Sequence, residues 1–162
     1  MNSATPPKSR VRLVLASIAL ALYAALVLVA VFWPTPIDRD YQSSIVKVLE
    51  VLHRHGIPNW FGYNKLEFLA NIAMFVPLAF LVALVLPTRV WWLVLLICPA
   101  FSVAIELTQG ALLAERFASV LDVVANSTGA IIGTIIAVVL RALVHQRDEK
   151  VIAAALSRYR PA

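Results

Sequence analysis

The sequence has little cysteine and lacks the common short catalytic motifs. Its single cysteine, Cys98, cannot form an internal disulfide, and one cysteine excludes a zinc site built from several. No nucleophile elbow, phosphate-binding loop or metal-binding signature occurs in the 162 residues. We therefore expect no metal and no cofactor. Whether the protein is an enzyme stays open, with a non-enzymatic role favoured.

Charged residues are also scarce. They make up 14% of the chain, against 61% hydrophobic residues, and the mean hydropathy is +0.84. A soluble domain carries roughly 25% charged residues, so this composition indicates a membrane protein. Most of the net charge of +5 lies in the two terminal segments, which suits anionic lipid headgroups. No basic stripe is interleaved with aromatic residues, so we expect membrane lipids as partners and no nucleic acid.

Long apolar runs predict an all-α fold, a four-helix transmembrane bundle. About 20 apolar residues span the hydrocarbon core of a bilayer. The first run exceeds the roughly 7–15 apolar residues of a signal peptide, which is the competing interpretation. We expect a basic cytoplasmic tail over 1–12, one transmembrane domain over 13–142 and a basic cytoplasmic tail over 143–162. The expected spans are at about 13–33, 65–86, 90–110 and 119–142.

The loop between the first two spans contains a short amphipathic pattern. Ile45, Val48, Leu49 and Leu52 recur at helical spacing. We expect a short helix here that lies in the interface plane of the membrane.

The start of the second span is marked by Asn64, with Glu67 three residues later. This spacing is typical of a capping pair, so we expect the helix to begin at about Lys65.

The basic residues predict the orientation. Nine of the fourteen Lys and Arg residues fall on the side of the two termini once four spans are drawn. Positive residues concentrate on the cytoplasmic side, so we expect both termini in the cytoplasm. The amphipathic segment and the ends of the polar spans then face outward.

Polar residues interrupt the apolar spans at the predicted outward end. Carboxylates and amides are expensive in hydrocarbon, so the default interpretation is a functional site. The four-span topology brings residues from three helices and a loop to one depth. The candidate pocket residues are Asn71, Glu106, Gln109, Arg116, Asp122 and Asn126.

Structural roles compete with a ligand site at each of these positions. Ser119 and Asp122 have the spacing of a capping box, which would satisfy the amides at the start of the fourth span. Asn126 fits an interhelical hydrogen bond. Glu106 and Arg116 fit a structural ion pair, because a carboxylate near the negative end of a helix needs a partner.

Two glycines form a second pattern on the fourth span. Gly129 and Gly133 are four residues apart, beside Ala125 and Ala137. Small residues at this spacing let another helix approach closely, so we favour helix packing over ligand contact here.

Taken together, these motifs resemble the VanZ-like family of bacterial membrane proteins, over about residues 13–142. The resemblance rests on order and spacing: the segment 68–78 with Asn71 and Pro77, then Glu106-x2-Gln109, Arg116, and Asp122-x3-Asn126-x2-Gly129-x3-Gly133. It implies a protein of the bacterial cytoplasmic membrane, linked to susceptibility to teicoplanin-type glycopeptides. It implies no settled reaction.

Two classes of function follow, with a third in reserve. The first is a non-enzymatic envelope protein whose outward polar pocket binds a lipid headgroup or a lipoglycopeptide. The second is an intramembrane enzyme acting on a lipid phosphate or a lipid-linked cell-wall precursor. The third is a small assembly subunit. An oligomer remains open under all three.

Overall fold

The computed structural model describes residues 10–32, 42–112 and 119–158. The described residues form helices and no strands. These are α1 (Arg10–Val31), α2 (Gln42–Arg54), α3 (Tyr63–Val85), the 3-10 helix η2 (Thr88–Leu93), α4 (Val94–Leu112) and α5 (Val120–Arg158). Four stretches are long and apolar enough to cross a membrane: α1, α3, η2 together with α4, and most of α5. The predicted all-α bundle of four spans is confirmed, and the chain is a multi-pass membrane protein.

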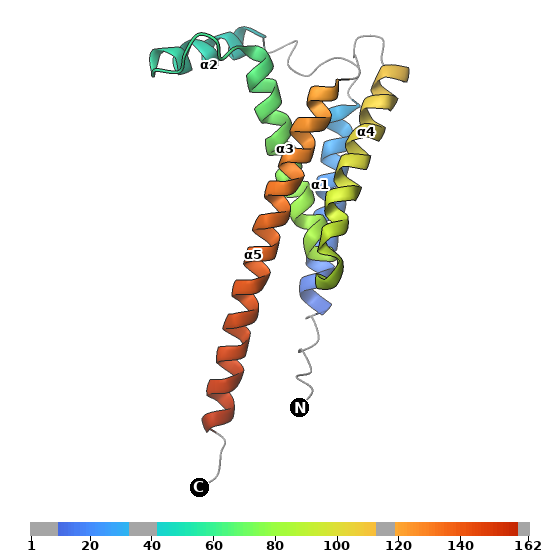
Figure 1. Ribbon diagram of the computed structural model, residues 1–162, viewed down its shortest axis with the longest axis vertical. Coiled ribbons are helices and arrows are strands. Elements are labelled where there is room, and N and C mark those ends of the chain that lie inside the picture. Colours follow the sequence, from blue (N-terminus) through green and yellow to red (C-terminus); the bar gives the residue numbers. More distant parts are fainter. Residues whose placement is uncertain (1–9, 33–41, 113–118, 159–162) are drawn as a thin grey trace.

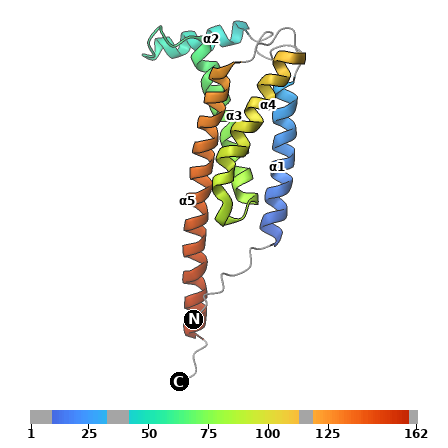
Figure 2. The same cartoon turned by 45° about the vertical axis from the view of Figure 1, so that its right-hand side comes forward.

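The four long helices run side by side, and α2 projects sideways from one end of them, at the start of α3 (Figures 1 and 2). We call this the α2 end. There α1 and α4 end, and α3 and α5 begin, whereas α1 begins and α5 ends toward the opposite end (Figure 1). Helix α3 is the common element, because it packs against α5, α1 and α4, and α4 packs in turn against α5.

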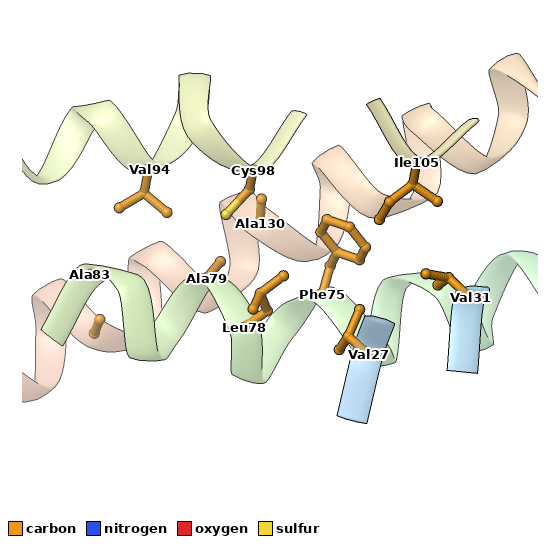
Figure 3. Close-up of a cluster of buried hydrophobic side chains, with 11 residues drawn as sticks. Val27, Val31, Phe75, Leu78, Ala79, Ala83, Val94, Cys98, Ile105 and Ala130 are labelled. Atoms are coloured by element: carbon orange, nitrogen blue, oxygen red, sulfur yellow. The ribbon is translucent and has the colours of Figure 1, made fainter. Parts of the chain in front are cut away.

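The core is a narrow seam between these helices (Figure 3). Phe75 on α3 is fully buried, and Val27 of α1, Cys98 of α4 and Ala130 of α5 are buried in the same cluster. Most other large apolar side chains point away from the seam, as Leu22 does at 69% exposure. In lipid such exposure carries no hydrophobic penalty, so close packing of small residues holds the bundle together.

Helix α2 occupies the segment where the amphipathic pattern predicts a helix. Its apolar face is not covered by the bundle: Val48 and Val51 are 48% and 52% exposed. At the corner between α2 and α3, the ammonium group of Lys65 lies 4.7 Å from the ring centre of Trp60. An uncovered apolar face across the end of a bundle suits a position in the membrane interface.

The capping pair predicted from Asn64 and Glu67 is wrong. Helix α3 begins at Tyr63, its N-cap is Gly62 in an extended conformation, and no side chain caps it. Asn64 is therefore already inside the helix, and Glu67 lies beyond the first turn, where it cannot reach back to the N-cap amide.

Two helix boundaries also differ from the expected spans. The third span starts with the 3-10 turn η2 and becomes α-helical only at Val94. The last helix continues well past Ala142 and ends at Arg158. No glycine or proline occurs between Gly133 and Arg158, so nothing in this sequence interrupts the helix.

Polar contacts also join the helices toward the end of the bundle opposite the α2 end. The guanidinium of Arg141 on α5 donates to the carbonyl oxygens of Leu84 (2.6 Å) and Leu86 (2.9 Å), which lie at the end of α3. Arg141 thereby caps the last carbonyls of α3. Arg12 and Asp148 join the start of α1 to α5 in an exposed ion pair of 3.4 Å.

Candidate functional site

The polar residues of α3, α4 and α5 meet near the α2 end. Hydrogen bonds join these residues between neighbouring helices and, from Ser119 to Asp122, at the start of α5. We call the following set the polar cluster: Asn71, Ser102, Glu106, Ser119, Asp122 and Asn126.

Glu106 is tied to the start of α5. It is 6% exposed and lies on the buried face of α4. Its carboxylate oxygen Oε2 accepts a hydrogen bond from the backbone N–H of Ser119 at 2.7 Å. That N–H lies at the N-terminus of α5, whose positive end stabilises a carboxylate. The C-terminal end of α4, where Glu106 itself lies, disfavours a negative charge.

Ser119 also acts as the N-cap of α5. Its hydroxyl accepts the backbone N–H of Asp122 at 3.4 Å. In a capping box the side chain of Asp122 would return a bond to the N–H of Ser119. Here Glu106 takes that N–H instead. The carboxylate of Asp122 makes a contact between helices.

Asp122 is paired with Asn71 across the α3–α5 interface. The side-chain amide of Asn71 donates to the Asp122 carboxylate at 2.8 Å. Both side chains are half-buried, so this pair forms the more accessible part of the polar cluster. A hydrogen bond to a charged acceptor in a dry environment is stronger than one between neutral groups.

Asn126 and Ser102 form the deepest pair. Ser102 on α4 is fully buried, Asn126 on α5 is 3% exposed, and Asn126 Nδ2 donates to Ser102 Oγ at 2.8 Å. The other amide atom, Asn126 Oδ1, is buried and has no hydrogen-bond partner. A buried acceptor left without a donor costs about 1–3 kcal/mol.

Gln109 lies apart from the polar cluster. Its side chain is buried and its Nε2 donates to the backbone carbonyl of Val31 at 2.6 Å. Val31 is the last residue of α1, so Gln109 satisfies a free carbonyl at a helix end and ties α4 to α1. The sixth candidate, Arg116, lies outside the described residues.

The two glycines face α3. A Cβ atom added at Gly129 would collide with the carbonyl oxygen of Ile72 and lie 2.9 Å from Phe75 Cβ. One added at Gly133 would collide with the carbonyl of Val76 and lie 2.9 Å from the backbone nitrogen of Phe80. The two helix backbones therefore touch here, directly below the Asn71–Asp122 pair.

Sequence reasoning missed two groups that the cluster uses. Ser102 is not among the candidate residues predicted from the sequence, and residue spacing does not identify the backbone N–H of Ser119 as the partner of Glu106. A signal existed for Ser102, because it precedes Glu106 by four residues and so shares its helix face. The Ser119 contact depends on how the chain returns from α4 to α5, and residue spacing does not report that path.

The cluster is rich in acceptors. It presents two carboxylates, one unpaired amide oxygen and two hydroxyl groups, held by backbone and amide donors. In the part of the chain that the structure describes, no group of three or more His, Cys, Asp or Glu side chains is placed to hold a metal ion. The carboxylates, the amides and the hydroxyl groups can bind a ligand by hydrogen bonding and electrostatics, and a carboxylate can also serve as a general acid or base.

Comparison with known proteins gives one match. The family model described as VanZ/LLP1 matches residues 20–141, which is three quarters of the chain and includes every residue of the polar cluster. No curated protein and no solved structure matches.

Proposed function

The chain belongs to the VanZ/LLP1 family, and from this premise we propose that its polar cluster binds the headgroup of a membrane lipid. In this proposal the α2 end faces outward and both termini lie in the cytoplasm of a bacterial cell. A lipid-linked wall precursor or the membrane-anchored part of a lipoglycopeptide would present a headgroup to the same site. Occupancy of the site would then affect susceptibility to teicoplanin-type glycopeptides.

One observation carries the proposal: the half-buried pair of Asn71 and Asp122, joined at 2.8 Å at the α2 end. Its amide and carboxylate stand at a level where apolar side chains would suffice for packing. Below the pair, Gly129 and Gly133 already bring α3 and α5 into backbone contact, so these helices have a packing contact that is independent of the pair. Polar groups kept at such a cost in a membrane protein support the proposal of a binding site.

The position of α2 supports the same conclusion. This amphipathic helix projects sideways from the start of α3, roughly at right angles to the long helices, with its apolar face uncovered (Figure 1). Lying in the interface, it would hold the cluster at the depth of lipid headgroups.

The test is lipid retention by the purified protein, measured by native mass spectrometry after release from membranes. We expect Asp122→Asn, which removes the charge at nearly constant shape, to lower retained lipid about tenfold, or about 1.4 kcal/mol. The control is Thr128→Val on the same helix, because the hydroxyl of Thr128 bonds only to the carbonyl of Val124 at 2.8 Å. Equal retention by wild type and Asp122→Asn contradicts the proposal. Complementation of a deletion strain would then show whether glycopeptide susceptibility follows lipid retention.

A further inference from the structure

The guanidinium of Arg141, at the end of the bundle opposite the α2 end, uses only part of its hydrogen-bonding capacity. Its Nη2 donates to the carbonyl oxygens of Leu84 at 2.6 Å and Leu86 at 2.9 Å. A guanidinium has five N–H groups, so three remain on Nη1 and Nε. Among the described residues, no carboxylate pairs with Arg141 and no further hydrogen bond uses these groups. Arg141 is half-buried, so part of its side chain is accessible.

Arg141 lies at the depth where the helices leave the hydrocarbon core. Its two carbonyl acceptors lie at the end of α3, whose apolar span is Tyr63–Val85. Arg141 also follows Val120, the first residue of α5, by 21 residues. That length of helix extends roughly 32 Å, close to the thickness of the core. Trp91 and Trp92 in η2 are 41% and 49% exposed, and tryptophan is typical of the headgroup level.

A second arginine lies close to this position. Arg89 is exposed and follows the second carbonyl acceptor by three residues, so its backbone lies within roughly 11 Å of that acceptor's residue. No carboxylate in the described part of the chain pairs with Arg89. The acidic residues in the last part of α5 have other partners: Asp148 pairs with Arg12 at 3.4 Å, and Glu149 lies 3.3 Å from His145. The two guanidinium groups therefore attract an anion at the level of the lipid headgroups.

We propose that Arg141 and Arg89 bind the phosphate group of an anionic lipid in the leaflet opposite α2. A guanidinium can hold two phosphate oxygens through parallel N–H bonds, and the anchoring of Arg141 Nη2 by α3 orients the rest of its fork. Basic pockets between membrane helices are typical sites for anionic headgroups. A zwitterionic lipid brings a cation of its own, which the two arginines repel. This site lies at the other end of the bundle from the polar cluster and is independent of it.

The experiment compares two lipids of different net charge. The full chain is reconstituted in nanodiscs of equal parts phosphatidylglycerol and phosphatidylcholine, and the retained lipids are counted by native mass spectrometry. We expect wild type to retain the glycerol lipid about tenfold over the choline lipid. Arg89→Gln and Arg141→Gln should each lower this ratio to about twofold.

The matched control is Arg147→Gln, which removes the same charge from an exposed position on the same helix. Arg147 lies roughly 9 Å farther along α5 than Arg141, about one Debye length, and on another face of the helix. The ratio should therefore stay above about fivefold. Arg141→Gln also removes the cap of α3, so Arg89→Gln decides the outcome if that variant does not fold.

Three outcomes would overturn the inference. Wild type could retain the two lipids equally. Arg89→Gln and Arg147→Gln could lower the ratio by the same factor, which would show general attraction to positive charge and no site. Added inorganic phosphate could abolish the preference in wild type, which would show a site for the free ion. Asp122→Asn should keep the preference for the glycerol lipid, so this inference and the proposed function can fail separately.

Discussion

Single side chains in this protein serve the ends of helices other than their own. Glu106 on α4 accepts the first N–H at the start of α5, Gln109 on α4 donates to the last residue of α1, and Arg141 on α5 caps the end of α3. In the hydrocarbon core, a backbone N–H or C=O group without a protein partner cannot form a hydrogen bond to water. Long polar side chains from neighbouring helices therefore replace water at these ends.

Substitutions of Glu106 should rank by how well they still accept the Ser119 N–H. Glutamine keeps an acceptor oxygen but loses the charge, and we expect Glu106→Gln to lower the free energy of unfolding by about 1 kcal/mol. Glu106→Ala leaves a buried donor unpaired and a cavity, and should cost about 3 kcal/mol. Unfolding in mixed micelles with rising dodecyl sulfate, followed by tryptophan fluorescence, measures both. Thr108→Val, which removes a hydroxyl bonded to its own helix, should change stability by less than about 0.5 kcal/mol. A larger loss in the glutamine variant than in the alanine variant would contradict this account.

For single residues, the sequence predicts which polar side chains share a helix face, but it does not predict their partners on neighbouring helices. The placing of Asp122 and Asn126 on one stripe of a helix follows from a period of 3.6 residues. Which group faces each of them depends on how far one helix is shifted along its neighbour. Asn71 meets Asp122, and Ser102 meets Asn126, because of a shift that no periodicity within a single helix encodes.

Among the elements, α3 and α5 form the closest contact. Gly129 and Gly133 bring the backbone of α5 onto α3 between Ile72 and Phe80. Such contacts gain dispersion energy over a long stretch, and membrane helices depend on it because lipid tails do not drive them together. The contact also sets the spacing at which Asn71 can reach Asp122.

The substitution Gly133→Ala tests the α3–α5 contact, because it adds a single methyl group there. In an ordinary helix the exchange stabilises by about 1 kcal/mol. Here the new methyl group collides with the Val76 carbonyl, and we expect a loss of about 1–3 kcal/mol in the free energy of unfolding, measured in the same micelle titration. Ile135→Leu is the control, since Ile135 is 57% exposed and should tolerate the exchange within about 0.5 kcal/mol. A stabilised alanine variant would show that the two helices can separate without penalty.

Helix existence could be read from hydropathy, whereas helix ends could not. The four apolar runs and the amphipathic segment were predicted because each is long or strongly periodic. The start of α3 was missed because Gly62 caps it through backbone conformation alone, with no side chain to recognise. The end of α5 was missed because the residues after Ala142 are polar enough to leave a membrane yet have good helix propensity.

For the whole molecule, the distribution of basic residues predicts how the bundle sits in the membrane. We expect the α2 end outside and the two termini in the cytoplasm. In a Cys98→Ala background, a membrane-impermeant thiol reagent applied to intact cells should label a cysteine at Asn59. It should not label one at Thr88 or Gln146, although all three positions are exposed. The same cells after lysis supply the control, since all three positions should then react. Labelling at Thr88 in intact cells would contradict this topology. It would show the opposite orientation, with the polar cluster on the cytoplasmic side.

Helix α5 is long and continuous, without an interruption from Val120 to Arg158. Its 39 residues extend roughly 58 Å, about twice the thickness of the hydrocarbon core. Asp122 and Asn126 lie at one end of this helix, and the other end stands beyond the rest of the bundle (Figure 1). A tilt of about 5° pivoting at the cluster would move the far end by about 5 Å, and a turn about the axis would pass along it undiminished. A displacement of α5 at the α2 end would therefore also shift the segment of this helix that extends beyond the rest of the bundle (Figure 1).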